Sequence, residues 1–447
     1  MTLIPDYISE KPDRAVLKEG PPAEPATGRG RSHGTSSSQP FDRWFRYPAG
    51  FASDYVSVLL QHLNLSTGLI IDPFAGSGVT GTAARAQGLS FFGVEAHPMI
   101  AELGNLKLSP PPDAAEELTR YARSISSTAT ELSASAIHQN DSETELVQRC
   151  FSSENLTKLA SLRNLIQSDA DNPWATYLKW ALLATLRDVA SARVGWPYQR
   201  PGAQRRPKYA DPIARFLQRS EWIASDIKKL SGVKEDAPWG HVVNGDSRDE
   251  ISWQGLPEKI GDGCISSPPY LNNFDYADAT RLELYFWGDV RSWSQMCEEV
   301  RNGMLTATTQ QSSLAESSSA VTELEKLGST GEQIQELADE LSAQRLKRKR
   351  GKEYDRVIPA YFCAMTYILE NLQKRLRPGA QVVWLIGDSA PYSTYIDTPK
   401  LIAEIAKAKG FVFEKDTILR HRGQRWSGNS SRHTVALAER LLLLRCE

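Results

Sequence analysis

Four consecutive residues, Ser267, Pro268, Pro269 and Tyr270, carry groups that could position an amine for a transfer reaction. They follow the apolar run GCIS, and the two prolines fix φ and stiffen the turn. A serine hydroxyl and a proline carbonyl can accept two N–H hydrogen bonds from an exocyclic amine and direct its otherwise delocalised lone pair at an electrophile. Tyr270 could stack on the ring that carries the amine. The alternative interpretation is an ordinary Pro-Pro turn beside a packed tyrosine.

A glycine-rich turn with the sequence DPFAGSG, from Asp72 to Gly78, follows the apolar run GLIID and precedes a helical segment. Glycines at such a turn let the backbone approach a ligand that a Cβ would exclude. Glu95 ends the next strand-like run about 20 residues later, where a carboxylate can accept hydrogen bonds from ribose hydroxyls. Alone, the turn would suit a dinucleotide equally well, and Glu95 could be a solvated strand end.

Strand-like runs and helical segments alternate around both turns and must position them. The first strand, the helix over 79–88 and the strand FFGVEA form a βαβ opening. HVVNGDS, GDGCISSPPY and AQVVWLIGDS each resemble a buried strand that ends in a polar turn, and GFVFEKDTILR with TVALAERLLLLRC would form a hairpin. The pattern predicts an α/β fold with a mixed sheet of about seven strands, mainly parallel with a C-terminal antiparallel hairpin.

These motifs resemble those of the amino-group DNA methyltransferases of bacterial restriction-modification and related systems. That family has an aromatic-proline motif, a D-P-F-x-G-S-G turn, an acidic strand end and a [DNS]-P-P-[YFW] turn. The chain matches them, in the alpha or gamma order, with Tyr47 to Phe51, Asp72 to Gly78, Glu95, and Ser267 to Tyr270. The resemblance covers residues 41–100 and 240–447 and implies a Rossmann-like fold that uses S-adenosylmethionine and needs no metal.

The resemblance also implies roles for individual residues. Asp72 would lie near the methionine amino group of the donor, Glu95 would bind its ribose, and Asp246 would lie near its adenine. Ser267 and the Pro268 carbonyl would position the amine of a flipped base, while Tyr270 would stack on that base. The expected cofactor-binding residues are Tyr47, Pro48, Phe51, Asp72, Pro73, Phe74, Gly76, Gly78, Glu95 and Asp246.

The longer run SPPYLNNFDY is similar to a subset of the family and adds three pocket candidates, Asn272, Asp275 and Tyr276. Serine at the first position of the diproline motif favours cytosine N4 as the methylated atom in this family. Adenine N6 is the alternative. The related tRNA and protein methyltransferases, and a degenerate subunit without activity, are further alternatives that the intact motifs disfavour.

The resemblance to the family and the composition together suggest four regions. Residues 1–40 are rich in Pro, Gly and Ser, which predicts a disordered lead-in. The catalytic domain is expected over 41–100 and 236–447. A helical insertion over 101–235 would recognise the target sequence, and a second insertion over 288–352 would interrupt the catalytic domain.

Double-stranded DNA is the expected partner, together with a possible cognate restriction endonuclease. Arginines, lysines and interleaved aromatic residues in the helical insertion suit phosphate and base contacts, although a solvated basic loop is the alternative. The candidates for DNA binding are Arg193, Arg200, Arg205, Arg206 and Lys208, with Arg187, Arg215 and Arg219 nearby. Two further candidates are the run Lys347 to Arg350 with Lys352, and the group Arg420, Arg422, Arg425 and Trp426.

The composition is that of an ordinary globular protein of 447 residues, with 40% hydrophobic and 24% charged residues. The formal net charge of −2 excludes a uniformly basic coat, so DNA contacts must come from local clusters. The five cysteines show no metal-ligand spacing, which argues against zinc and against a disulfide framework. Without a membrane-length apolar run or a signal-like start, the expected location is the bacterial cytoplasm, in association with the nucleoid.

Overall fold

The structure is a computed structural model that describes residues 39–47, 52–109, 111, 115–131, 142–191, 210–229, 238–271, 275–308, 313–422 and 436–447. The predicted lead-in over 1–40 lies outside these ranges except for its last two residues. None of the helices in the described part of the chain is both long enough and apolar enough to cross a bilayer.

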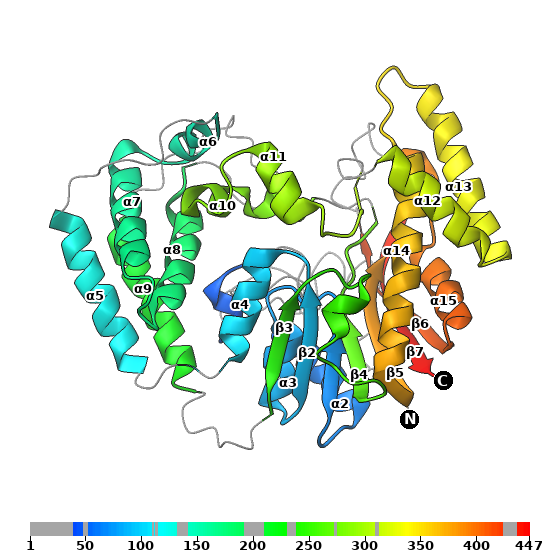
Figure 1. The fold of residues 1–447 in the computed structure, drawn as a ribbon, viewed down its shortest axis with the longest axis horizontal. Helices are drawn as coiled ribbons and strands as arrows, with labels where there is room; N and C mark the ends of the chain where they lie inside the picture. Colours follow the sequence, from blue (N-terminus) through cyan, green and yellow to red (C-terminus); the bar gives the residue numbers. More distant parts are fainter. Residues whose placement is uncertain are drawn as a thin grey trace.

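A seven-stranded sheet with the order β3-β2-β1-β4-β5-β7-β6 forms the centre of the fold (Figure 1). β1 pairs in parallel with β2 and β4, β2 with β3, and β4 with β5, whereas β7 is antiparallel to both β5 and β6. This arrangement confirms the predicted fold class, including the antiparallel hairpin. The strands are β1 (Leu69–Asp72), β2 (Ser90–Glu95), β3 (Gly240–Asn244), β4 (Gly261–Ser266), β5 (Leu376–Gly387), β6 (Phe411–Arg422) and β7 (Leu437–Cys446).

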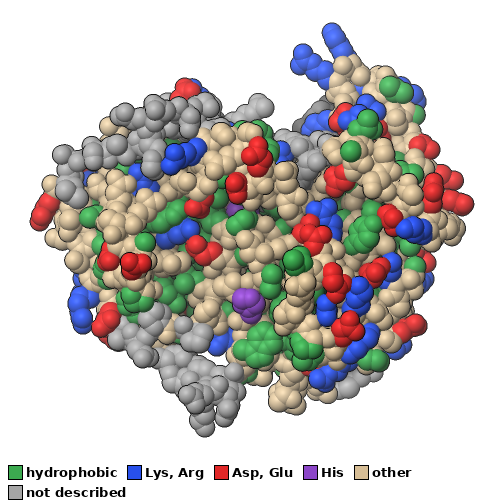
Figure 2. Space-filling model, viewed as in Figure 1, with side chains coloured by type: hydrophobic (Ala, Val, Ile, Leu, Met, Phe, Trp, Pro, Cys, Tyr) green, Lys and Arg blue, Asp and Glu red, His purple; other side chains and the backbone are tan. Residues whose placement is uncertain are grey.

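Alternate residues of each buried strand face two different helical layers. Ile70 belongs to the core that includes α2 (Ser53–Leu63) and α3 (Val79–Ala86). Its neighbour Ile71 belongs to the core that includes α14 (Tyr354–Arg375) and α15 (Thr398–Ala408). Because both faces are covered, the strands are continuous apolar runs, and the polar residues that end them mark the carboxyl edge of the sheet. Charged side chains of both signs are scattered over the face in Figure 2.

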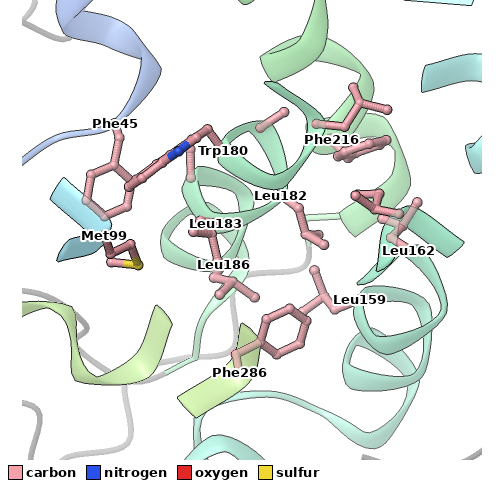
Figure 3. Close-up of a cluster of buried hydrophobic side chains, with 14 of the residues drawn as sticks. Phe45, Met99, Leu159, Leu162, Trp180, Leu182, Leu183, Leu186, Phe216 and Phe286 are labelled. Atoms are coloured by element: carbon pink, nitrogen blue, oxygen red, sulfur yellow. The ribbon is translucent and has the colours of Figure 1, made fainter. Parts of the chain in front are cut away.

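A group of helices packs beside the sheet and has its own apolar core (Figure 1). It comprises α5 (Ala115–Glu131), α6 (Ser142–Cys150), α7 (Ser153–Ser168), α8 (Ala175–Val189) and α9 (Pro212–Ile227). Figure 3 shows Trp180 of α8 beside Phe45, in a cluster that also includes Met99 of α4 (Pro98–Leu108) and Phe286 of α10 (Arg281–Trp287). The helical group is therefore joined to the sheet domain by shared core residues.

Two more helices, α12 (Leu314–Glu325) and α13 (Ser329–Leu346), lie along α14. Leu324, Ile334 and Leu341 are buried in the same core as the sheet residues. The short elements are η1 (Asp42–Trp44), η2 (Glu250–Trp253), η3 (Asp278–Thr280), η5 (Pro391–Ser393), α11 (Trp293–Met296) and the π-helical turn η4 (Cys297–Arg301).

Candidate active site

A cavity of about 840 Å³, which includes space open to solvent, lies at the carboxyl ends of β1, β2, β3 and β4. This edge of a parallel sheet is where α/β proteins bind ligands. The cavity brings together both chemically suggestive turns, since Ser267 and the glycine turn line it. The predicted residues on its wall are Tyr47, Asp72, Pro73, Phe74, Gly76, Glu95, Asp246, Ser267, Pro269 and Tyr276.

Other predicted site residues have different positions. Four of them do not line the cavity, but each is adjacent in sequence to a residue that does: Gly78, Pro268, Tyr270 and Asp275. The predictions for Pro48, Phe51, Asn272, Arg193, Arg200, Arg205, Arg206 and Lys208 fall outside the described residues. Sequence reasoning missed Ala75, Ser77, Val79, Thr80, Val94, Ala96, Ser247, Gly303, Met304, Leu305 and Ile368.

Positive φ angles shape the glycine turn. Gly76 has φ of 52° and Gly78 has φ of 77°, a region that residues with a Cβ rarely adopt. A Cβ on Gly78 would also lie 3.1 Å from Cα of Gly104 on α4. The two glycines therefore let the turn bend tightly against α4 and leave its backbone exposed along the cavity.

Glu95 organises this turn from the end of β2. One carboxylate oxygen accepts a hydrogen bond from the backbone N–H of Gly76 at 2.8 Å, and the other accepts one from the N–H of His97, also at 2.8 Å. Burial raises the pKa of Glu95 to about 7, while these hydrogen bonds lower it. Glu95 lines the cavity, and a carboxylate oxygen can accept more than the one hydrogen bond that each of its oxygens receives here.

Asp72 connects the two turns through buried hydrogen bonds. Its carboxylate accepts hydrogen bonds from the hydroxyls of Ser266 at 2.5 Å and Thr80 at 2.8 Å. It also accepts one from the N–H of Phe74. Burial raises the pKa of Asp72 to about 6. Since Ser266 directly precedes Ser267, Asp72 fixes the end of β4 against the end of β1.

The catalytic-turn candidate is held from outside the cavity. Tyr361 of α14 donates its hydroxyl to the carbonyl of Pro269 at 2.9 Å. Tyr270 is only 8% exposed, and its hydroxyl donates to the carboxylate of Glu439 on β7 at 2.7 Å. The guanidinium of Arg420 on β6 also binds Glu439. Arg420 was predicted to contact DNA, but here it is engaged in this internal network.

The segment after the turn is fixed by a buried ion pair. Tyr276 lines the cavity, while its neighbour Asp275 accepts hydrogen bonds from the N–H groups of Ala277 and Asp278. The second carboxylate oxygen of Asp275 binds the guanidinium of Arg301, and both side chains are buried. Because Arg301 precedes the wall residues 303–305, the ion pair links two parts of the cavity wall.

Two arginines of the predicted DNA-binding group also form internal ion pairs. Arg187 lies 2.6 Å from Glu283, which is fully buried, and stacks over Phe45. Arg219 binds Asp188 at 2.8 Å. Both of these predicted DNA-binding arginines therefore have internal acidic partners.

Polar residues that follow β3 form another part of the cavity wall. Asp246 lines the cavity and is paired with Arg248 at 2.5 Å. Ser247 donates its hydroxyl to the carbonyl of Pro73, which holds the loop after β3 against the glycine turn. Within the described residues, His, Cys, Asp and Glu form no group of three or more that could hold a metal ion.

The cavity fits a nucleoside-containing ligand. The bare backbone at Gly76 gives room for close approach, and Glu95 offers acceptors at one point of the wall. Apolar side chains, including Phe74, Leu305 and Ile368, provide surfaces against which a flat ring can pack.

Comparison with known proteins finds similarity to DNA methyltransferases. A family model described as DNA methylase matches residues 26–105. The Type II methyltransferase M.BsoBI of Geobacillus stearothermophilus is 25% identical over 443 residues, covering 90% of this chain and 83% of that protein. The Type II methyltransferase M.AvaI of Nostoc sp. is 24% identical over 404 residues, covering 86% and 82% respectively. The family model and these relatives support the resemblance of this chain to the amino-group DNA methyltransferases.

Proposed function

We propose that the protein is a site-specific DNA methyltransferase that transfers a methyl group from S-adenosylmethionine to the exocyclic amino group of a flipped base. The observation that carries the proposal is that one cavity is lined both by Ser267 and Pro269 of the diproline turn and by Gly76 and Glu95. A donor and an amine bound there would be neighbours, which is the requirement for direct transfer.

The proposed donor site uses the residues on the β1, β2 and β3 side. The chemistry that S-adenosylmethionine supplies when bound is an electrophilic methyl group on a sulfonium sulfur. Glu95 would accept hydrogen bonds from the ribose hydroxyls, and Asp246 would lie near the adenine. Phe74 and Leu305 would shield the site from water.

The proposed amine site uses the diproline turn. The Ser267 hydroxyl and the Pro268 carbonyl would accept the two N–H hydrogen bonds and turn the nitrogen lone pair toward the methyl group. The hydroxyl of Tyr270 is bound to Glu439, which leaves the ring as the part of this residue that could contact the base. Asn272, Asp275 and Tyr276 complete the proposed substrate side, with Asp275 acting through its ion pair with Arg301.

Cytosine N4 is the favoured target atom, and Ser267 at the first motif position is the reason. Adenine N6 is the second candidate. Residues 101–235 would read the DNA target, with Arg193, Arg200, Arg205, Arg206 and Lys208 as contacts. Because the relatives are named Type II methyltransferases, a cognate restriction endonuclease belongs to the proposal, and the place of action would be the nucleoid in the bacterial cytoplasm.

The test is to incubate the protein with labelled donor and duplex DNA, tRNA or a protein substrate, and then to identify the methylated nucleoside by mass spectrometry. We expect label in DNA as N4-methylcytosine. Finding N6-methyladenine instead would show that adenine N6, the second candidate, is the target atom. Label only in tRNA or protein would overturn the proposal.

Variants at the turn test the site itself. Ser267→Ala and Tyr270→Ala should each lower DNA labelling by about a hundredfold, because the amine loses its positioning contacts. The matched controls, Ser153→Ala and Tyr367→Ala, change exposed residues of the same types outside the cavity and should keep full activity. Unchanged labelling in both turn variants would remove the catalytic assignment.

A further inference from the structure

A tip of basic residues, Lys347 to Lys352, joins α13 to α14. Lys347, Arg348, Lys349 and Arg350 are all exposed, as is Lys352. Figure 2 shows Lys and Arg side chains projecting beyond the rest of the surface at this end of α13. A basic run of this kind can simply be solvated. Whether it can bind a partner depends on three things: how well its conformation is fixed, whether nearby acids neutralise it, and how far it lies from the diproline turn.

The tip is held in a defined conformation. Tyr392 donates its hydroxyl to the carbonyl of Lys352 at 2.9 Å and also accepts a hydrogen bond from the N–H of Lys352. The guanidinium of Arg348 stacks over the ring of Tyr392 at 4.0 Å, and Tyr354 packs edge-on against the same ring at 4.8 Å. One aromatic residue therefore anchors both ends of the tip, which reduces the entropy that the tip would lose on binding a partner.

The cations of the tip are left uncompensated by the nearby acids. Asp355 is paired with Arg345 at 2.9 Å, and Glu353 is paired with Arg356 at 2.6 Å. Across the residues for which the structure gives contacts, no ion pair involves Lys347, Lys349, Arg350 or Lys352. The tip is thus a local concentration of positive charge on a protein with a net charge of −2.

The helix α14 fixes the position of the tip relative to the diproline turn. Tyr361, whose hydroxyl binds Pro269, lies two helical turns after Tyr354 at the start of α14. The tip therefore stands roughly 10 Å farther out along the helix axis than the contact with Pro269. Ile368, two turns further in the other direction, lines the cavity. Along the axis of α14, the contact with Pro269 therefore lies between the tip and Ile368.

We infer that the tip binds backbone phosphates of duplex DNA beside the flipped base. The inference rests on the proposed function, because a base that leaves the duplex to reach Ser267 would come from the side of the turn opposite the donor. Phosphates that flank this base lie within the reach of long lysine and arginine side chains at such a distance. The contact would orient the duplex without reading its sequence.

The experiment replaces Lys347, Lys349 and Arg350 with Gln and leaves Arg348 in place, because that residue packs on Tyr392. Binding to a fluorescein-labelled duplex of mixed sequence, about 40 base pairs long, is measured over a series of salt concentrations. If all three cations contact phosphates, the slope of log Kd against log salt concentration should fall by about 2 to 3. Each lost contact contributes about 0.9 to that slope.

The matched control carries Lys326→Gln, Lys400→Gln and Lys407→Gln, which change the net charge equally at exposed positions. Lys326 lies at the opposite end of the α12–α13 pair, and the other two lie on α15. Its slope should equal that of the wild type. If wild-type protein methylates DNA while the tip variant keeps the wild-type slope, the inference about the tip is wrong. If wild-type protein methylates no DNA, the proposed function fails first.

Discussion

At the scale of single residues, Glu95 combines a structural task with a place on the cavity wall. Its two oxygens hold the N–H groups of Gly76 and His97, and its pKa is raised to about 7 by burial. An acid with a raised folded-state pKa costs stability as pH rises from its ordinary value of 4.5 toward 7, since the unfolded chain ionises first.

Binding of the donor should show the opposite dependence on pH. Ribose hydroxyls donate to the ionised form of Glu95, so the Kd for S-adenosylmethionine should rise as pH falls below about 7, by at most about tenfold per pH unit. Isothermal calorimetry between pH 5.5 and 8 would measure it. Glu95→Gln should flatten the curve above about pH 6, where the remaining contribution of Asp72 ends. A steep curve in this variant would assign the proton to another group.

Glu439 is expected to position Tyr270 without touching substrate. Glu439→Gln should lower kcat by about tenfold to a hundredfold and leave the KM for donor within about twofold, because it loosens only the amine side of the cavity. Tyr270→Phe, which keeps the ring, should lose less activity than Tyr270→Ala. Steady-state kinetics on duplex DNA would measure these effects. Equal losses in kcat and donor affinity would indicate general damage to the fold.

Most of the predicted site residues that line the cavity lie in short motifs at the ends of strands. Ser267, Gly76 and Glu95 are of this kind. Met304 and Ile368 were missed because long-range packing alone brings them to the wall. Asp275 was expected in the pocket, yet its carboxylate accepts hydrogen bonds from the N–H groups of Ala277 and Asp278 and binds Arg301, and no local sequence pattern distinguishes such an acid from one that binds a ligand.

At the scale of elements, the ion pair between Asp275 and Arg301 joins the segment after the diproline turn to the π-helical turn η4. Arg301→Met should destabilise the protein by about 3–5 kcal/mol, because it leaves the Asp275 carboxylate buried without its cation. The double variant Asp275→Asn/Arg301→Met should recover part of that loss. Urea unfolding of the four proteins in the cycle would measure it. Additive losses would show that the pair is not coupled.

The strands were predictable because their apolar runs end in polar turns. The pairing of α12 and α13 with α14 was not, since a Ser/Thr-rich segment followed by a charged helix does not reveal which face it buries. Ile334 and Leu341 become core residues only through contact with α14 and its neighbours.

At the scale of the whole molecule, Asp226 ties the N-terminal aromatic segment to α9. Its fully buried carboxylate binds Arg43 at 2.6 Å and also accepts hydrogen bonds from the N–H of Phe41 and the indole of Trp44. Because Tyr47 of the same segment lines the cavity, this contact links the helical group to the wall of the cavity. The sequence could not reveal this contact, whose partners are about 180 residues apart.

Asp226→Ala should therefore lower the free energy of unfolding by about 3–5 kcal/mol and weaken donor binding as well. Thermal unfolding and calorimetry would measure the two effects. The control Asp211→Asn changes an acid at the other end of α9 and keeps a residue type that caps helices well, so it should have little effect. Donor affinity that is unchanged in Asp226→Ala would show that Tyr47 keeps its place without this anchor.

The strand order has a consequence for synthesis on the ribosome. β6 is synthesised before β7 but pairs only with β7. It therefore has no strand to pair with until β7 inserts between β6 and β5. An unpaired strand is an open template for wrong partners in the meantime. The hydrogen bond of Tyr270 also depends on β7, because its acceptor Glu439 lies on that strand. The contact between Tyr270 and Glu439 can therefore form only after β7 has been synthesised, much later than the glycine turn from Asp72 to Gly78.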